Sequence, residues 1–578
     1  MLEQRASQPQ AGESELQRTP IEPAVSSRIA LQDCLFLSLI VSLSVVLYIK
    51  GLGFYSDDWH FLGLLSNSSD QSLFGLIGSV FPDTRLRPIQ TLYVAVPYWL
   101  FGTHPLGYHL INAVVFLLTI MLFYLSLREL LQMRLFMITV PLVYALLPHY
   151  STDRFWYIAF VANLSIGLYF LSLYSDLKGS RAGRVRSLKW RLLSIVSLLC
   201  SALAYELILP LFLLNPLLVW RRREGLSKMI PRRDSVRRLL IAPLVGNVLL
   251  IALVAGYKIL IAKGVSSGFV HKVVIYGDYS RHLRRLVTEA IGVNFGSYGI
   301  ALPIKIWRAV RFYPDPTILL GSVLVAVIIF IYVYRAINRP QTDLPGEACY
   351  FKLMGVGLIV FVSGYAIFLT NSNFALATTG INNRLAIAGA LGVAILFVAV
   401  IGWVSWMLPS PRLRLGLFSL LVALLGGAGF LLNNTIAAFW IAASRQQKET
   451  ISAVRQQLSA LPPETTLILD GVCPYTGPGI VFECYWDVGG MLRTYYHDPS
   501  IRGDIAKRNV QASDQGLYTR IYGEKKYYPY SEKLMLFDVG QNKVYGLKDF
   551  EAARLYFQAS SPARNACPDG EGDGAWIF

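Results

Sequence analysis

Long apolar segments recur along this chain, and they restrict its fold more than any other feature. Hydrophobic residues account for 54% of the 578 positions and charged residues for only 15%. A transmembrane helix needs about 20 consecutive apolar residues. Segments that meet or approach this length lie at 30–49, 107–130, 135–150, 157–176, 192–220, 239–262, 316–335, 351–370, 385–408 and 415–434. This composition excludes a soluble protein and predicts an α-helical polytopic membrane protein.

The positions of basic residues predict how these segments thread the membrane. The formal net charge is +17, but much of the excess lies in short loops between apolar segments. Basic residues there mark the cytoplasmic side, so the charge does not indicate a nucleic-acid partner. Loops 178–191 and 221–238 are both expected in the cytoplasm, so 192–220 must cross twice or form a re-entrant hairpin near Tyr205–Glu206. The count is then about eleven transmembrane helices, with the amino terminus inside and the carboxyl terminus outside.

By composition the chain divides into three parts. Residues 1–28 are polar and contain three prolines, which predicts a disordered cytoplasmic tail. Residues 29–436 are expected to form the transmembrane domain, and residues 437–578 a small soluble extracytoplasmic α/β domain with nearly balanced charge. The elements expected in the last part are a helix at Trp440–Leu461 and strands at Thr466–Leu469, Leu534–Phe537 and Lys543–Leu547.

Three of the six cysteines, Cys473, Cys484 and Cys567, lie in this carboxyl-terminal part. An oxidising exterior favours a disulfide among them, most simply Cys473–Cys484 because the loop between them is short. Their spacing lacks the paired ligands of a zinc site, so no metal is expected. No phosphate-binding loop or dinucleotide-binding fingerprint is found in the sequence, and no cofactor is expected.

A stretch with two adjacent acids, Gly51–Leu62, directly follows the first apolar segment. Asp57 and Asp58 stand there among four aromatic residues and His60. Neighbouring carboxylates repel each other, and desolvation at a membrane edge raises the pKa of at least one of them. A solvated turn that ends a helix would explain an isolated pair. The motifs that follow, Arg85-Leu-Arg87-Pro88 and the run FGTHPLGYHLIN at 101–112, favour a functional site instead.

This ordered set of motifs resembles the GT-C superfamily of membrane glycosyltransferases. The nearest likeness is to the protein O-mannosyltransferase and aminoarabinose-transferase branch and its bacterial relatives. The likeness rests on recognisable motifs in residues 30–220. In the rest of the chain it rests on hydropathy and topology alone. The resemblance implies an inverting hexosyl or pentosyl transferase of a bacterial inner membrane that uses a polyprenyl-phosphate sugar donor. The acceptor, a lipid, protein or polysaccharide of the cell envelope, would be modified on the outer face, and membrane lipid would be a further partner.

The resemblance also assigns expected roles to residues. The resemblance places the catalytic acid of the family on Asp57, with Asp58 beside it. Physical chemistry agrees with this role, since a carboxylate at an aromatic-walled membrane edge can have its pKa raised and serve as a base. His60 is a competing base or an interfacial anchor. Arg87 suits carboxylate orientation or phosphate contact. His104 also matches the pattern, and His109 and Asn112, three apart on a helix, are expected to be structural hydrogen-bonding groups.

Four more residues are expected to bind substrate. His149 and Asp153 match the family in type, although Asp153 could pair with Arg154 at the surface. Glu206 stands in an apolar stretch and must face protein or water, but Tyr205 precedes it where relatives often carry lysine. Arg384 is the candidate cation for binding the phosphate of the donor. The alternative explanation is that its side chain simply snorkels to the membrane surface. The alternatives to Arg384 are Lys258, Lys263, Arg281 and Arg284.

Two other functions remain open from the sequence. A transporter or flippase of lipid-linked glycans would also bind an anionic lipid, but should show pseudo-repeats and broken central helices. A polymerase or ligase of such glycans would share the large basic outward loop, Lys263–Asp315, without needing the acid pair. That loop is itself ambiguous, because Tyr279–Ile291 could be an interfacial amphipathic helix or could handle an anionic ligand.

Overall fold

The computed structural model describes residues 26–131, 133–224, 240–262, 279–337, 346–370, 374–507, 510–521, 524–558, 567 and 578. The expected tail up to residue 25, most of the basic loop 221–238 and the first part of the outward loop, 263–278, lie outside the described residues. Within them, nine helices are long and apolar enough to cross a membrane. They are α1 (Ser27–Val46), α5 (Pro105–Leu130), α8 (Val161–Gly179), α9 (Arg184–Ala204), α12 (Ala242–Ala262), α15 (Pro316–Ile337), α16 (Glu347–Tyr365), α17 (Ile387–Trp406) and α18 (Pro411–Gln457).

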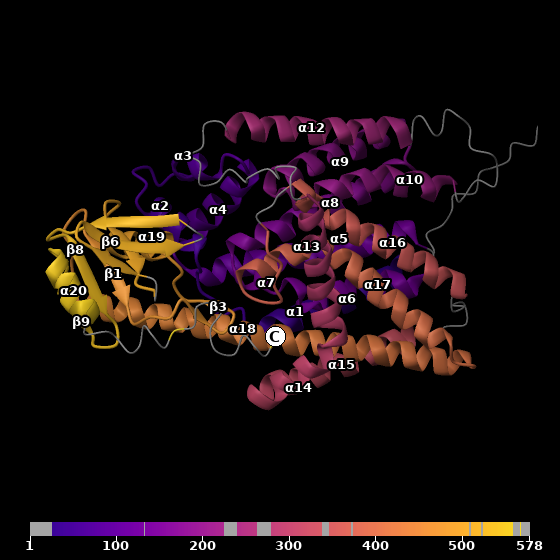
Figure 1. The fold of residues 1–578 in the computed structure, drawn as a ribbon. Coiled ribbons are helices and arrows are strands. Elements are labelled where there is room, and N and C mark those ends of the chain that lie inside the picture. The colour runs from indigo at the N-terminus through magenta and orange to yellow at the C-terminus, as the bar shows by residue number, and fades with distance from the viewer. Residues whose placement is uncertain are drawn as a thin grey trace, which may run out of the picture.

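The two remaining expected crossings correspond to shorter helices. One is α6 (Arg134–Leu146), which has 13 residues and is buried along its whole length. The other follows the turn expected near Tyr205–Glu206, where α9 ends and the chain returns as the 3-10 helix η3 (Glu206–Leu213) and then α10 (Leu214–Glu224). Pro210 lies inside η3 and has no backbone N–H to donate. The chain is therefore a mostly helical, multi-pass membrane protein (Figure 1).

Several short helices lie between the long ones, the earliest of them in the chain beside the carboxyl-terminal domain (Figure 1). They interrupt the loops between long helices and bring the polar motifs together. These helices are α2 (Asp57–Ser66), α3 (Leu73–Thr84), α4 (Pro88–Phe101), η1 (Pro148–Tyr150), α7 (Thr152–Phe155), η2 (Ile158–Phe160), α13 (Tyr279–Ile291), the π-helix η6 (Gly292–Ile300), α14 (Leu302–Phe312), η7 (Ala366–Thr370) and η8 (Ile381–Ala386).

Helix α18 joins the membrane bundle to the carboxyl-terminal domain. It runs for 47 residues without a break, or about 70 Å at 1.5 Å per residue. The helix expected at Trp440–Leu461 is confirmed as far as Gln457, but it continues the last span without a break and is not a separate element. The boundary expected at residue 437 falls inside this helix and stays a prediction. Gly429 brings α18 close to α6, since a Cβ there would lie 2.2 Å from the carbonyl oxygen of Leu146.

The carboxyl-terminal domain contains a four-stranded sheet in the order β4-β1-β8-β9. Strands β4 (Arg502–Ile505), β1 (Thr466–Asp470) and β8 (Leu534–Asp538) are parallel, and β9 (Lys543–Gly546) is antiparallel to β8. The strands expected from the sequence are confirmed as β1, β8 and β9. The other elements are the pair β2 (Tyr475–Thr476) and β3 (Gly479–Ile480), a sheet of β5 (Gln511–Ser513), β6 (Gly516–Ile521) and β7 (Glu524–Pro529), and helices α19 (Tyr485–Tyr496) and α20 (Phe550–Gln558).

The expected disulfide Cys473–Cys484 is wrong. Cys473 is bonded to Cys567, and Cys484 is free and buried. Cys484 instead begins α19: its side chain accepts from the backbone at the third helical position, while Asp487 accepts from the backbone of Cys484. The sequence spacing could not show this capping arrangement.

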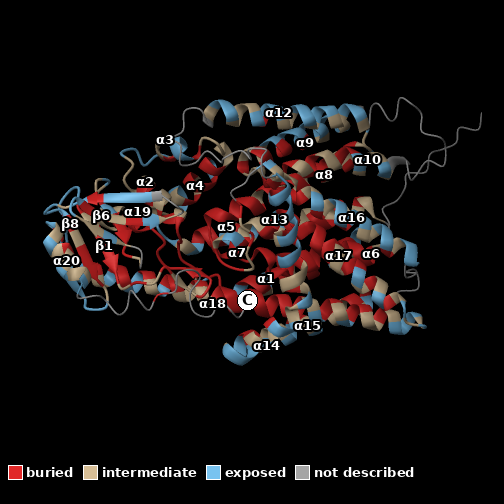
Figure 2. Ribbon diagram, viewed as in Figure 1, coloured by how far each residue is buried: buried red, intermediate tan, exposed pale blue. Residues whose placement is uncertain are grey.

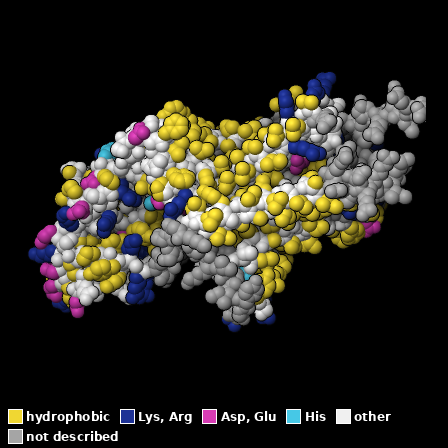
Figure 3. Space-filling view, turned by 90° about the horizontal axis from the view of Figure 1, so that it is seen from above, with side chains coloured by type: hydrophobic (Ala, Val, Ile, Leu, Met, Phe, Trp, Pro, Cys, Tyr) yellow, Lys and Arg dark blue, Asp and Glu magenta, His cyan; other side chains and the backbone are white. Residues whose placement is uncertain are grey.

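Burial separates the core from the membrane-facing surface. Figure 2 shows buried residues concentrated around α6, α7 and α17, whereas α12 and α14 are largely exposed. On helix α12, for example, the side chains of Leu249, Leu253, Ile259 and Leu260 are exposed. Seen from above, hydrophobic side chains cover the middle of the molecule and basic side chains gather toward its ends (Figure 3). Such a broad apolar surface fits contact with lipid rather than water.

Candidate active site

Asp58, the second of the paired acids, is fixed by backbone hydrogen bonds. Its Oδ2 accepts from the N–H of Tyr55 at 2.9 Å and its Oδ1 from the N–H of Ile158 at 3.0 Å. The side chain is only 3% exposed. Asp58 thus ties the first turn of α2 to η2, the short helix that precedes α8, and both of its carboxylate oxygens are occupied.

Asp57 differs from its neighbour. It is partly buried, and no described residue donates a hydrogen bond to its carboxylate. Burial raises the pKa of Asp57, while charges on Arg384, His60 and Arg87 act in the opposite direction. Three of the residues expected from the sequence to bind substrate therefore act electrostatically on one carboxylate.

The backbone just before Asp57 adopts an unusual conformation. Ser56 has φ +45°, a region that side-chain-bearing residues rarely occupy. Its hydroxyl donates to Glu483 Oε2 at 3.3 Å and accepts from Trp486 Nε1 at 3.3 Å. Both partners belong to the carboxyl-terminal domain. That domain therefore holds the turn from which Asp57 projects, and the sequence contained no signal for Glu483 or Trp486.

Arg384 lies in η8, and its charge acts on the carboxyls of both Asp57 and Asp153. Its guanidinium carbon is 5.0 Å from the ring centroid of Trp156. Its buried Nε makes no hydrogen bond to any described residue. Asn383, which sequence reasoning missed, fixes this segment: its amide nitrogen donates to the carbonyl of His149 at 2.8 Å.

Asp153 and Arg154 do not form the surface pair that the sequence allowed. Both are buried, and Arg154 donates instead to the carbonyl oxygens of Ala145 and Leu147. Neither carboxylate oxygen of Asp153 has a hydrogen-bond partner among the described residues. Burial raises the pKa of Asp153 well above its usual value, with Arg384 and Arg154 opposing this effect. Asp153 is therefore a buried carboxyl on which the charge of Arg384 acts.

His149 is also inside the protein. It is fully buried, and its Nε2 donates to the carbonyl of Asn294 at 3.0 Å. Burial lowers the pKa of His149 to about 4. A histidine with so low a pKa is neutral near pH 7, so His149 brings no positive charge to an anionic substrate.

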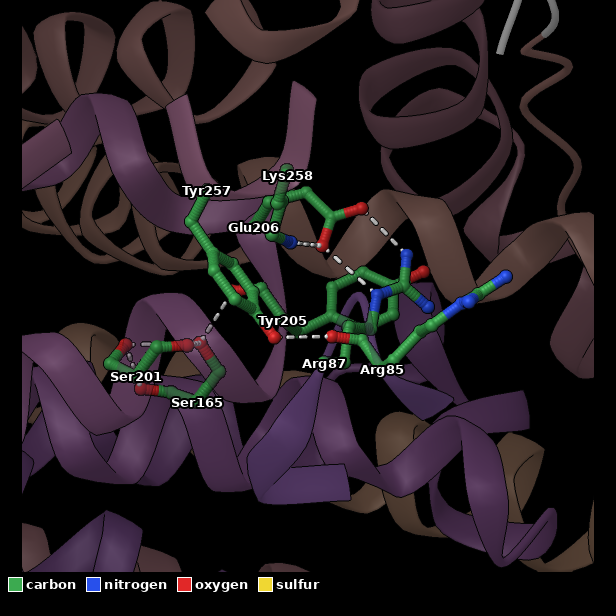
Figure 4. A network of polar contacts seen from close by, with 8 residues as sticks. All are labelled: Arg85, Arg87, Ser165, Ser201, Tyr205, Glu206, Tyr257 and Lys258. Atoms are coloured by element: carbon green, nitrogen blue, oxygen red, sulfur yellow. Dashed lines mark hydrogen bonds and ion pairs between the residues drawn. The ribbon is translucent and has the colours of Figure 1, made fainter. Parts of the chain in front are cut away.

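A second charged network joins Arg87, Glu206 and Lys258 (Figure 4). Arg87 donates to Glu206 from Nε at 3.0 Å and from Nη2 at 2.6 Å, and Lys258 donates to the same carboxylate at 2.8 Å. The guanidinium of Arg87 also lies 4.2 Å from the ring centroid of Tyr205. Two cations share one carboxylate, so the network has a net charge of +1, which favours an anion nearby.

Lys258 comes from α12, far along the chain from the motifs. Tyr205, which directly precedes Glu206, packs under Arg87. Glu206 is satisfied by two cations, which confirms that it faces protein rather than lipid. The hydroxyl of Tyr257 donates to the carbonyl of Arg85 at 2.7 Å and fastens α12 to the loop before α4 (Figure 4).

Three further motif residues, His60, His109 and Asn112, have hydrogen-bond partners. His60 Nε2 lies 2.8 Å from Asp83 Oδ2, a partner that sequence reasoning missed although Asp83 stands just before the Arg85–Pro88 motif. The hydrogen bond from His60 lowers the pKa of Asp83. His109 Nε2 donates to the carbonyl of Gly53 at 2.9 Å, and Asn112 accepts from the hydroxyl of Tyr93. The hydrogen bonds expected of His109 and Asn112 are present.

Comparisons with known proteins give structural matches only. No family model matches the chain, and no curated protein matches it. One similar solved structure is ArnT from Cupriavidus metallidurans bound to undecaprenyl phosphate, with 15% identity over 84% of this chain and 87% of that chain and a TM-score of 0.37. The same protein in the apo state matches with 15% identity over 77% and 83% and a TM-score of 0.35.

A second similar structure is the Archaeoglobus fulgidus oligosaccharyltransferase tethered with an acceptor peptide. It shares 12% identity over 82% of this chain and 64% of that chain, with a TM-score of 0.37. At these TM-scores the overlay is loose, and the roles of individual residues rest on the geometry of this chain. The similarity of this chain to ArnT and to the oligosaccharyltransferase is therefore a loose similarity of fold.

Proposed function

We propose that this protein is a membrane glycosyltransferase that moves a sugar from a polyprenyl-phosphate donor to an acceptor hydroxyl on the outer face of a bacterial inner membrane. The observation that supports this most is the difference between the two adjacent acids. Asp58 has both oxygens occupied by backbone N–H groups, whereas Asp57 has no hydrogen-bond donor among the described residues. A general base must have a free oxygen to take a proton from its substrate, and Asp57 meets that condition.

Asp57 acts as the base and Asp58 as its positioning residue. The acceptor hydroxyl gives its proton to Asp57 while its oxygen attacks the anomeric carbon of the sugar. The bond from that carbon to the phosphate oxygen breaks, and polyprenyl phosphate leaves with the electron pair. Attack opposite to the leaving group inverts the anomeric centre. Burial raises the pKa of Asp57, which brings its basicity closer to that needed near neutral pH.

The cations around Asp57 receive the phosphate. Arg384 is the first contact, because its buried Nε lacks a hydrogen-bond partner among the described residues and its charge acts on Asp57. A charge-assisted hydrogen bond to phosphate stabilises both the bound donor and the leaving group. The charge of Arg384 also acts on the carboxyl of Asp153, and Arg87 borders the site with Glu206 and Lys258. His60 stands beside Asp57 with Asp83 as its partner.

The test is sugar transfer by the purified protein in proteoliposomes with radiolabelled polyprenyl-phosphate sugars and an envelope extract as acceptor. Asp57→Asn keeps the side-chain shape but cannot take a proton, so transfer should fall by roughly 10²–10⁴-fold. Asp58→Asn serves as the matched control at the next position and should lower transfer less. If both variants insert normally and transfer sugar at the parental rate, the proposal is wrong. Movement of the donor between leaflets without transfer would favour a flippase.

A further inference from the structure

A cavity of about 530 Å³ lies between α8, α9, α10 and α12, outside the candidate active site. Its size is within the usual range for small-molecule sites. Most of its lining is apolar, with Ile195, Leu199, Val219, Leu249, Leu250 and Leu253 among the contributing residues. Several of these side chains are also exposed to the surroundings of the bundle, so the cavity opens toward lipid.

The charged groups of the cavity are confined to one end, and Asn247, which also lines it, donates to the carbonyl of Phe212. Asp176 and Ser180 stand where α8 ends, and Arg191 lies in the first half of α9, about two helical turns after the start of that helix. Asp176 and Arg191 are near enough for the charge of Arg191 to act on the Asp176 carboxyl, yet they form no ion pair in the described structure. The opposite end of α9 leads to Tyr205 and the active-site network, so the polar end of the cavity is the end remote from Asp57.

We propose that this cavity binds one acyl chain of a phospholipid whose headgroup carries both a phosphate and an amine. The phosphate would meet Arg191 and the ammonium group would meet Asp176, while the chain runs along the apolar wall toward Leu253. An anionic lipid without an amine would leave the Asp176 carboxylate facing a phosphate, which is repulsive. The sugar donor fits less well, because its phosphate must reach Asp57 at the other end of the bundle.

A lipid in this cavity would also position part of the active-site network. Leu253 and Lys258 are five residues apart on α12, about 7.5 Å along the helix axis. A lipid chain that fills the cavity next to Leu253 would therefore hold α12 at a fixed distance from α9. This would support the ion pair between Lys258 and Glu206, whose nitrogen and oxygen are 2.8 Å apart. The binding site itself does not depend on the transferase proposal.

Two glycines of α12 provide a matched pair of variants. A Cβ added at Gly246 or at Gly256 would meet no atom within 4 Å, so both positions accept a larger residue without a backbone clash. Gly246 lines the cavity and Gly256 does not. Gly246→Trp should fill the cavity, whereas Gly256→Trp adds the same surface to the same helix and leaves the cavity open.

The experiment is native mass spectrometry of the full chain, delipidated in detergent and titrated with phosphatidylethanolamine or phosphatidylglycerol. We expect one phosphatidylethanolamine per chain, bound about tenfold more weakly by Gly246→Trp and by Arg191→Gln but unchanged in Gly256→Trp. In the parental protein, a photoactivatable acyl chain should label peptides of α9 and α12, a result that needs no variant. Equal binding of both lipids, or labelling confined to other helices, would overturn the proposal. So would displacement of a bound polyprenyl phosphate by Gly246→Trp.

Discussion

Ser56 and Glu483 stand 427 positions apart in the sequence and are joined by a hydrogen bond of 3.3 Å from the serine hydroxyl to the carboxylate. Glu483 also accepts from the hydroxyl of Tyr475 at 3.0 Å, so the carboxylate is held within its own domain. The bond therefore connects the carboxyl-terminal domain to the residue that precedes Asp57. A role for this domain follows from the contact: it supports the geometry of the acid pair.

We expect Ser56→Ala to be more harmful than Ser56→Gly. Alanine loses the hydroxyl contacts but must keep the φ of +45°, a strained conformation that costs on the order of 1–3 kcal/mol. Glycine loses the same contacts but adopts that φ without strain. Sugar transfer by both variants in proteoliposomes measures the difference, with thermal unfolding in detergent as the stability readout. Equal loss in the two variants would show that backbone strain at Ser56 plays no part.

Packing between α19 and α2 gives a second prediction. A Cβ on Gly490 would lie 2.2 Å from the carbonyl oxygen of Trp59, so the two helices touch through backbone atoms. Gly490→Ala must push α19 away from α2, and overpacking of this kind costs about 1–3 kcal/mol. We expect a lower unfolding temperature and reduced transfer. Gly546→Ala in β9 is the control, because a Cβ there meets nothing within 4 Å. If Gly490→Ala behaves like Gly546→Ala, the contact does not position the acid pair.

Segment length and local pattern made much of this structure predictable. The apolar spans, the break at Tyr205 and strands β1, β8 and β9 follow from features within each segment. The contacts that build the site join distant parts of the chain and leave no local pattern. Lys258 reaches Glu206 from α12, Asn383 fastens the segment of His149, and Cys473 bonds to Cys567 rather than to the nearer Cys484.

The charges around Glu206 give a third prediction. Glu206→Gln leaves Arg87 and Lys258 without their shared counter-charge, so the two cations repel each other across a partly buried site. We expect a loss of about 1–3 kcal/mol in stability, measured as a lower midpoint of thermal unfolding. The double variant Glu206→Gln with Lys258→Met removes one of the two cations and should recover part of that loss. No recovery would mean that repulsion between the cations is not the cause.

The pH dependence of transfer tests the electrostatic relation between Asp57 and Arg384. Burial raises the pKa of Asp57 above its usual value, and only the deprotonated carboxylate can act as a base. The rate should therefore fall as the pH is lowered through that raised pKa. The positive charge of Arg384 lowers the pKa of Asp57, so Arg384→Gln should raise it further and move the acidic limb of the pH–rate profile to higher pH.

Arg384→Lys is the matched control for this experiment, because it keeps the positive charge and should leave the limb near its parental position. Both variants should weaken the apparent affinity for the donor, since lysine cannot reproduce the planar guanidinium contact with phosphate. A charge-assisted bond contributes about 1.5–3 kcal/mol, so Arg384→Gln should raise the donor concentration for half-maximal rate by roughly ten- to a hundredfold. If Arg384→Gln changes neither the acidic limb of the pH–rate profile nor the donor affinity, Arg384 does not belong to the site. Arg87 and Lys258 would then be the phosphate-binding cations.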